Sequence, residues 1–213
     1  MFQMMFEQWG LPKVIRFDNG KPWAHPQSGV PTSLALWLVG LGIQLVFGRP
    51  RQSTDNAVVE RSHGVLDAWV EPQQCADQAH FAQQVNKFVH IQREVYPSCD
   101  GRSRQEAYPE LLMPERLYNP QQDSQIWQCQ LVLDYVAQFR FTRTVEKIGR
   151  ISHFMREYSV GRAYAAQQVT IYLQVETVQW VVEDRYGEII AHFDADQFDY
   201  LTIANMNLKA RAG

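Results

Sequence analysis

Apolar positions in the first part of the chain recur with helical and strand periods in alternation. Phe2, Met5, Phe6 and Trp9 have helical spacing, and the Gly10–Pro12 stretch ends that helix. The apolar runs that follow predict a strand over residues 13–17, a buried helix over 32–41 and a second strand over 43–47. This order is typical of an α/β core.

Two amphipathic helices are predicted next. The first begins near Asp55, and its expected buried stripe is Val58, Ser62, Val65, Leu66 and Trp69. The second runs from about residue 77 to residue 95, where Pro97 follows it, and its apolar face is Phe81, Val85, Phe88, Gln92 and Val95.

The pattern changes after a polar connector at residues 119–129. Short alternating or β-branched runs follow at 131–141, 150–154, 168–174, 178–182 and 188–193, with Tyr186-Gly187 as a hairpin turn between the last two. Five short strands in so few residues predict a small β-barrel domain over residues 130–205.

Composition indicates a globular protein of 213 residues, with 46% hydrophobic and 20% charged residues. The net charge of −3 argues against a general nucleic-acid coat, because such binding depends on neutralising phosphates. The charge is uneven, however. Residues 140–162 hold six basic and two acidic residues, whereas residues 176–199 hold seven acids and Arg185 alone. We expect these two stretches to lie on different faces or to pair with each other.

The longest apolar run, residues 33–48, is too short to cross a bilayer and is interrupted by Gln44. No secretory signal begins the chain, and we expect a soluble cytoplasmic protein that meets the nucleoid when it acts on DNA. The three cysteines have neither disulfide nor zinc-site spacing.

Two acidic residues have the placement of metal ligands. Asp18 follows the predicted strand 13–17 and precedes Asn19-Gly20, and Glu60 lies near the start of the helix after Asp55. Hard divalent cations need oxygen ligands that converge from separate elements, as in magnesium-dependent phosphoryl-transfer sites. The alternatives are a turn aspartate that caps its own backbone and a solvated glutamate opposite the apolar stripe.

With their flanking residues, these two acids resemble the catalytic core of the integrase and transposase superfamily, whose ribonuclease H-like fold carries an Asp-Asp-Glu triad. Asp18 in IRFDNGKPW matches the second acid, and Glu60 in GRPRQSTDNAVVERSHGVL matches the third. The 41 residues between them hold the predicted helix and strand (60 − 18 − 1 = 41). The resemblance covers roughly residues 1–120, and the segment after the connector resembles the small β-barrel that follows the core in several transposase families.

The resemblance implies a fold and a function. The fold would be a partial ribonuclease H-like α/β core over residues 1–118, a linker over 119–129 and a small all-β barrel over 130–205. The function would be DNA transposition or integration by strand transfer, with Asp18 and Glu60 as catalytic ligands of Mg²⁺ or Mn²⁺. The partners would be transposon ends and target DNA, and an active relative would be a homo-oligomer.

Candidate DNA contacts are basic residues near the two motifs and in the basic stretch: Arg49, Arg51, Arg61, His63, Arg150 and Arg156. Arg49 and Arg51 could neutralise a phosphate or belong to a solvated basic loop. His63 has the alternative of an ordinary surface histidine. The aromatic residues interleaved with charges in 140–162 fit DNA contact, and they equally describe half-buried strands.

The chain departs from the family in two places. Relatives carry a first Asp on the first strand of the core, but only 17 residues precede Asp18 here. We therefore expect a truncated core that does not catalyse strand transfer by itself. In many relatives a Lys or Arg follows the Glu by two helical turns, where this chain has Asp67. The rival hypotheses are a non-enzymatic DNA-binding or multimerising remnant and a truncated product without a role.

Overall fold

The computed structural model describes residues 2–17, 29–48 and 57–209, except the side chains of residues 57–59 and 205–209. It is a mixed α/β protein with 43% helix and 22% strand, which confirms the broad fold class. The chain forms two compact units. Unit 1 is Met1–Pro12 with Gly48–Pro120, and unit 2 is Lys13–Phe47 with Gln121–Gly213. The division at residues 119–129 into a core and a tail domain stays a prediction.

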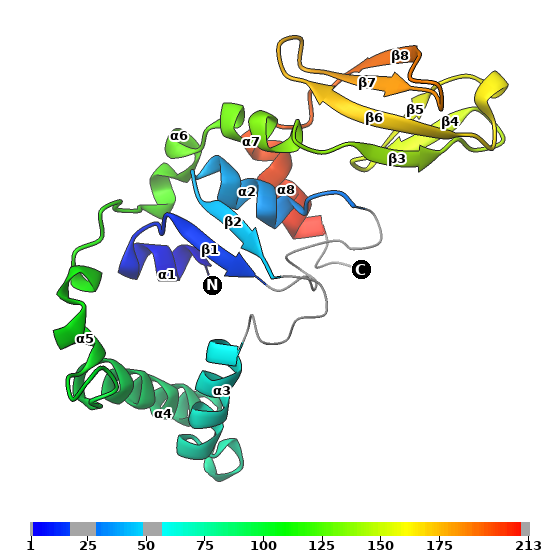
Figure 1. Cartoon of the computed structure of the whole chain (residues 1–213). Helices are drawn as coiled ribbons and strands as arrows, with labels where there is room; N and C mark the ends of the chain where they lie inside the picture. The colour runs from blue at the N-terminus through cyan, green and yellow to red at the C-terminus, as the bar shows by residue number, and fades with distance from the viewer. Residues whose placement is uncertain (1, 18–28, 49–56, 210–213) are drawn as a thin grey trace. The chain divides into compact units, whose positions relative to one another are not determined.

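Unit 1 is helical (Figure 1). Its helices are α1 (Phe2–Trp9), α3 (Ala57–Trp69), α4 (Gln78–His90) and the short α5 (Arg104–Ala107). Asp77 begins α4 by accepting a hydrogen bond from the His80 backbone N–H at 2.7 Å, and a π-helical turn, Ile91–Val95, continues it. The guanidinium of Arg93 in that turn lies 4.5 Å from the ring centroid of Trp9, which joins α4 to α1.

The predicted helices of unit 1 are confirmed, but their predicted burial is partly wrong. On α3, Val65 and Leu66 are half-buried, whereas Ser62 is exposed and the Trp69 side chain is 50% exposed. On the α4 segment, the predicted face is half-buried or buried except at Val95, which is 62% exposed. Helical period fixes which residues share a face, whereas burial requires a second surface packed against that face.

Unit 2 begins with a parallel strand pair. Strand β1 (Val14–Phe17) pairs with β2 (Gln44–Phe47) in the register Val14↔Gln44 through Phe17↔Phe47. Helix α2 (Ser33–Gly40) connects them, which confirms the predicted strand-helix-strand order. The Thr32 hydroxyl caps α2 by accepting from the Ala35 N–H at 3.2 Å. Gly42, with φ +72°, supplies the left-handed residue that turns the chain from α2 into β2.

Unit 2 also contains the helices α6 (Asp123–Ile126), α7 (Cys129–Val136) and α8 (Tyr200–Lys209), of which α7 and α8 pack against α2. The predicted strand over 131–141 is therefore wrong over most of its length. Val132, Leu133 and Val136 are buried at helical spacing, and the strand β3 starts only at Phe141. A short apolar run does not distinguish a helix from a strand by periodicity, and packing against α2 decides it here.

The remaining strands form a four-stranded antiparallel sheet in the order β3-β6-β7-β8 (Figure 1). They are β3 (Phe141–Thr144), β6 (Gln168–Gln174), β7 (Gln179–Glu183) and β8 (Ile189–Asp194). Strands β4 (Arg150–His153) and β5 (Arg156–Ser159) pair only with each other in the described structure. The predicted small barrel is corrected accordingly, because the described strands do not close into one. The β4–β5 hairpin instead lies with its aromatic residues against the sheet.

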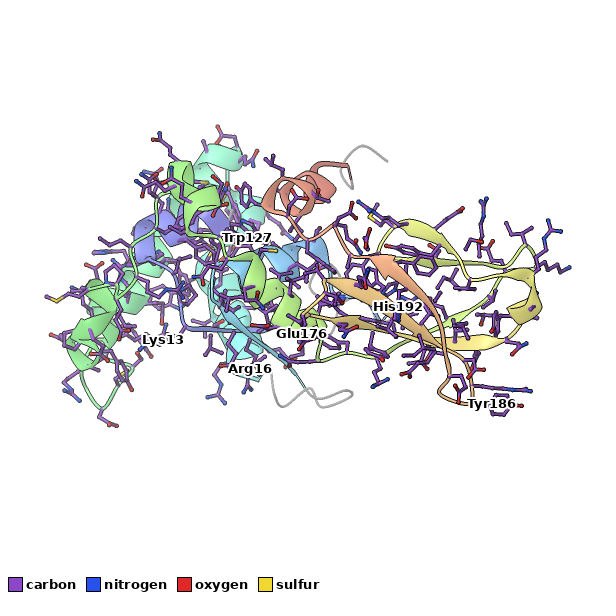
Figure 2. All side chains as sticks on the ribbon, turned by 90° about the horizontal axis from the view of Figure 1, so that it is seen from above. Lys13, Arg16, Trp127, Glu176, Tyr186 and His192 are labelled. Carbon is purple, nitrogen blue, oxygen red and sulfur yellow. The ribbon has the colours of Figure 1, made fainter. Side chains whose placement is uncertain are left out.

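The β7–β8 hairpin confirms the predicted turn at Tyr186-Gly187. The Asp184 carboxylate accepts from the backbone N–H groups of Tyr186 and Glu188, and Gly187 has φ +84°. Tyr186 projects from the tip of this hairpin, and its side chain is 73% exposed (Figure 2).

The longest helices in the described part of the chain, α3 and α4, have 13 residues each. Within the described ranges, no helix is both long enough and apolar enough to cross a lipid bilayer.

Candidate functional site

The strand that leads to the first candidate ligand is anchored at its end. Phe17, the last residue of β1, is buried, and its ring centroid lies 6.2 Å from that of its strand partner Phe47. Asp18 follows immediately in sequence. Asp18 itself lies outside the described residues, as do Arg49 and Arg51. The predicted convergence of the Asp18 and Glu60 carboxylates therefore stays a prediction.

The other candidate residues near the acidic motifs lie on α3. Glu60, Arg61 and His63 are all exposed, and Asp67 is exposed one turn further along. Val65 and Leu66 turn inward and are half-buried, so Glu60 lies off the apolar face as the helical period predicts. An exposed carboxylate flanked by a cation can accept a metal ion and can equally remain solvated.

A metal site would need further oxygen donors beside Glu60. In the part of the chain that the structure describes, no cluster of three or more His, Cys, Asp or Glu side chains is arranged to hold a metal ion. A carboxylate is the ligand type that Mg²⁺ and Mn²⁺ prefer, so the chemistry of Glu60 fits the group that the resemblance implies.

The candidate DNA-binding arginines of unit 2 lie on the β4–β5 hairpin and are ion-paired. Arg150 contacts the Glu157 carboxylate at 2.9 Å, and Arg156 pairs with Asp196. A third pair joins Arg140 and Glu183 at 3.2 Å. The pairs of Arg156 and Arg140 bridge the basic and acidic stretches, which confirms that these stretches pair in part.

These ion pairs are weak enough to exchange. The Arg150 and Glu157 side chains are 51% and 62% exposed, and those of Arg156 and Asp196 are 43% and 67% exposed. Ion pairs as exposed as these contribute about 0–1 kcal/mol each to the stability of the fold. The guanidinium groups can therefore leave their carboxylates for a more highly charged partner.

A buried histidine that the sequence did not single out lies under the same hairpin. The His153 side chain is 1% exposed, and its ring centroid lies 4.4 Å from Trp180 and 4.8 Å from both Phe141 and Phe154. Burial, and secondarily the positive charge of Arg143, lower the pKa of His153 to about 3. The imidazole is therefore neutral at physiological pH.

Both ring nitrogens of His153 are buried and lack a hydrogen-bond partner among the described residues. Strand alternation is the signal that could have found His153, because Ile151 and His153 share a face and both are buried. It does not reveal the rings that enclose His153, which come from β3, from β7 and from Phe154 in the hairpin turn.

A second buried polar cluster joins helices distant in sequence. Asp123 is 2% exposed, and its carboxylate accepts from the Trp37 indole at 2.8 Å and from the Tyr200 hydroxyl at 2.9 Å. Burial, with the hydrogen bond to Asp123 and its negative charge, raises the pKa of Tyr200 to about 12. The cluster ties α2, α6 and α8 together, and it has the features of a structural anchor rather than a reactive centre.

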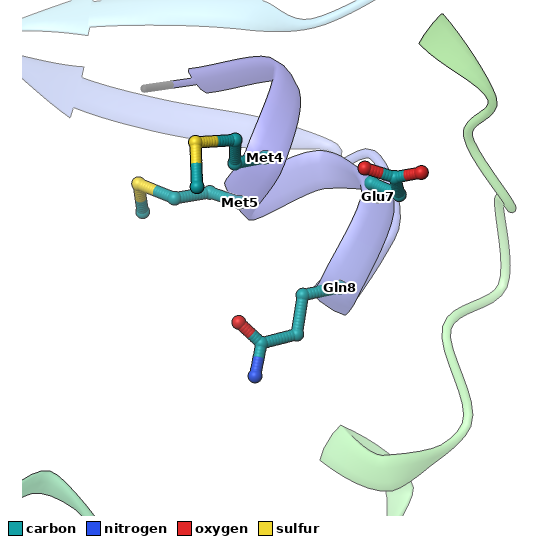
Figure 3. Close-up of a pocket in the computed structure, with 4 residues that line it drawn as sticks. All are labelled: Met4, Met5, Glu7 and Gln8. Carbon is teal, nitrogen blue, oxygen red and sulfur yellow. The ribbon is translucent and has the colours of Figure 1, made fainter. Parts of the chain in front are cut away.

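Unit 1 also has a surface pocket along α1. It is lined by Met4, Met5, Glu7 and Gln8, which come from consecutive turns of one helix (Figure 3). It combines one acid with one amide and two flexible apolar side chains. No convergence of elements builds it, so it gives no catalytic arrangement of its own. A comparison with the models of known protein families finds none that matches this chain.

Proposed function

We propose that the chain is part of a transposase- or integrase-type DNA strand transferase, with Asp18 and Glu60 as ligands of Mg²⁺ or Mn²⁺. The observation that carries the proposal is the parallel β1–α2–β2 arrangement. In it, β1 ends at Phe17, and Asp18 is the next residue in the sequence. Sites in open α/β sheets lie outside the carboxyl ends of the strands, where Asp18 follows β1. A ribonuclease H-like core is the specific fold that this proposal assigns.

Each candidate residue has a role in the proposal. Asp18 and Glu60 supply hard oxygen ligands, and Arg61 and His63, both exposed beside Glu60 on α3, contact DNA phosphates. Arg49 and Arg51 do the same from the segment before α3. When bound, the metal ions activate the attacking oxygen and stabilise the leaving oxygen of a phosphodiester.

Metal binding provides a test that does not require the complete reaction. The full chain is titrated with Mn²⁺ by electron paramagnetic resonance, and compared with Asp18→Asn and Glu60→Gln. We expect each variant to weaken Mn²⁺ binding by at least about tenfold, because even residues that only orient metal ligands have effects of this size. The matched control is Glu110→Gln, because Glu110 is an exposed glutamate of unit 1, as Glu60 is. This variant should bind Mn²⁺ like the unaltered chain. Equal Mn²⁺ affinity in all four proteins would refute the assignment.

DNA binding provides a second, independent test. Arg150→Ala with Arg156→Ala should weaken duplex binding uniformly across sequences and lower the salt dependence by a slope of about 2, about 1 for each lost phosphate contact. Fluorescence anisotropy over a salt series measures both quantities. A double variant that binds with unchanged affinity and slope would show that this hairpin does not contact phosphates.

A second candidate function is that of a non-enzymatic DNA-binding or multimerising protein. The distribution of apolar residues favours it. Of the 30 buried hydrophobic residues of the described chain, unit 1 contributes four: Phe6, Leu11, Val70 and Tyr118. Of the 19 exposed large hydrophobic residues, unit 1 contributes twelve: Met4, Met5, Trp9, Trp69, Val89, Val95, Tyr96, Tyr108, Leu111, Leu112, Met113 and Leu117. Unit 1 therefore exposes more large apolar residues than it buries, and association with another chain would cover them.

Sedimentation over a range of protein concentrations tests the second candidate. Association that weakens in Leu112→Glu and Leu117→Glu would support it, and a monomer at all concentrations would exclude multimerisation. A multimer that shows no metal dependence and no effect of Asp18→Asn would favour this candidate over the strand transferase.

A further inference from the structure

The β4–β5 hairpin turns through two residues with strained backbones. His153 pairs with Arg156, so Phe154 and Met155 alone close the hairpin, and their φ angles are +46° and +62°. Two-residue hairpins favour positive φ at both positions, which is why Asn-Gly and Gly-Gly are preferred there. For residues with a Cβ and a larger side chain, this conformation costs about 1–2 kcal/mol each.

The strain at Phe154 has a structural explanation. Its side chain is buried, with the ring stacked on Trp180 at a centroid distance of 5.2 Å and an interplanar angle of 25°. The ring also makes an edge contact with Phe198 at 5.2 Å. Burying an aromatic ring in this way contributes about 1.5–3 kcal/mol, which offsets the cost of the backbone.

Met155 has no such explanation within the folded chain. Its side chain is 79% exposed, so it gains little from packing, yet its backbone occupies the left-handed region. Asn or Gly at this position would form the same turn with less strain and without exposing an apolar chain. A contact outside the fold would give the exposed methionine a function at this position.

The charges around Met155 indicate the kind of partner. The stretch 140–162 carries a net charge of +4, from six basic and two acidic residues. Arg156 directly follows Met155, whereas Arg150 pairs with Ser159 at the opposite end of the same hairpin. Both form only exposed ion pairs, which a polyanion can displace. A protruding apolar residue followed by an arginine whose ion pair can exchange fits duplex DNA better than a protein surface, since a stable protein interface needs about 800 Å² from each partner.

We propose that Met155 is an apolar wedge that enters the minor groove of duplex DNA and partly unstacks one base step. Arg156 then holds a phosphate beside the wedge, and Arg150, at the other end of the hairpin, holds one further along the backbone. Wedges of this kind kink DNA by about 20–90°. The inference rests on the proposed function, because it specifies how the DNA-binding unit would engage its duplex.

The test compares the full chain with Met155→Asn and Met155→Gly, using Val178→Asn as a matched control that should bind and bend DNA like the unaltered chain. Val178 also has a positive φ, +51°, and is 37% exposed, but it lies between β6 and β7, outside the hairpin. Affinity is measured by fluorescence anisotropy, and bending by energy transfer between dyes at the ends of a short duplex. Both Met155 variants should bind about tenfold more weakly and bend the duplex less, with an unchanged salt slope because phosphate contacts remain.

Thermal stability separates loss of the wedge from loss of the fold. Because Asn and Gly relieve the strain, the Met155 variants should melt about 2–4 °C higher than the unaltered chain while binding DNA more weakly. If the unaltered chain binds duplex DNA and the Met155 variants bind and bend it equally well, the wedge is refuted and the proposed function is not. If the unaltered chain does not bind DNA, the DNA-binding part of the proposed function fails and the wedge fails with it. Variants that bind DNA normally but change the oligomeric state would refute the wedge in favour of a protein contact.

Discussion

The buried histidine of the C-terminal sheet makes a quantitative prediction about acid stability. His153 lies among the rings of Phe141, Phe154 and Trp180, and neither of its nitrogens has a hydrogen-bond partner among the described residues. An imidazolium there would be desolvated and would lie close to the positive charge of Arg143. Protonation is therefore much easier in the unfolded chain than in the folded one.

The size of the effect follows from the difference between the two pKa values. Unfolded His153 takes up a proton near its ordinary pKa of 6.5, whereas the folded pKa is about 3. Between these pH values the unfolded chain binds more protons, so the free energy of unfolding falls as the pH falls. The loss should be about 1.4 kcal/mol at pH 5.5 and about 2.7 kcal/mol at pH 4.5, because one pKa unit corresponds to about 1.4 kcal/mol. Below about pH 3 both forms are protonated and the loss stops growing.

The substitution His153→Phe isolates this contribution. A phenyl ring preserves most of the contacts in the cage and cannot take up a proton, so stability at neutral pH should be equal or higher. Urea denaturation followed by tryptophan fluorescence, between pH 7.5 and pH 4.5, gives the free energy of unfolding of each protein. The advantage of the variant should grow by the amounts above as the pH falls, whereas carboxylates that titrate in both proteins cancel in the difference.

His192, an exposed histidine on β8 of the same sheet, provides the matched control (Figure 2). His192→Phe should leave the pH dependence of stability as it is in the unaltered chain. Parallel curves for His153→Phe and the unaltered chain across this pH range would refute the reasoning, because His153 would then have to be solvated or hydrogen-bonded.

Other substitutions test the packing of unit 2 and the helices. Gly40→Ala should destabilise the chain by about 1–3 kcal/mol or more, because its Cβ would lie only 1.9 Å from the Trp127 indole nitrogen. Gly64→Ala, where the new methyl meets nothing within 4 Å, should stabilise α3 by up to about 1 kcal/mol, measured by urea denaturation and circular dichroism. Asp123→Ala removes the acceptor of the buried Trp37 indole and of the half-buried Tyr200 hydroxyl and should cost about 1–3 kcal/mol or more, whereas Tyr200→Phe removes one hydrogen bond and should cost about 0.5–1.5 kcal/mol. Equal losses in the last two variants would show that Asp123 does not anchor both helices.

Local periodicity was sufficient to predict the elements that lie close together in sequence. The strand-helix-strand segment at residues 13–47 and the strand β6 (Gln168–Gln174) have bounds close to those predicted. In these segments the side-chain period is clear, and Gly and Pro residues interrupt it at the ends. The same reasoning found the exposed position of Glu60, because a residue opposite an apolar stripe faces away from whatever the stripe contacts. It named Asp18 from its flanking residues, and the convergence of the two carboxylates stays a prediction.

Contacts between distant segments decided what periodicity left open. The run at residues 131–141 became α7 because Val132, Leu133 and Val136 pack in unit 2 against α2. The unpredicted helix α8 is held by Ile203, which is buried, and by the hydrogen bond from Tyr200 to Asp123, 77 residues earlier. A sequence pattern records which residues lie on one face of an element, but not which element will cover that face.

The clearest example is His153, whose neighbours in sequence predict only an ordinary strand residue. Its burial results from rings contributed by β3 and β7 and from the turn at Phe154. Its pKa of about 3 is a consequence of that enclosure rather than of the residue itself. The sequence alone thus determined many of the helices and strands and named the candidate ligands, whereas tertiary packing determined α7 and α8, the order of the sheet, the ion pairs of the arginines and the charge of the buried histidine. The physical reason is that desolvation and electrostatic interaction depend on distances in space, which the spacing of residues along the chain does not specify.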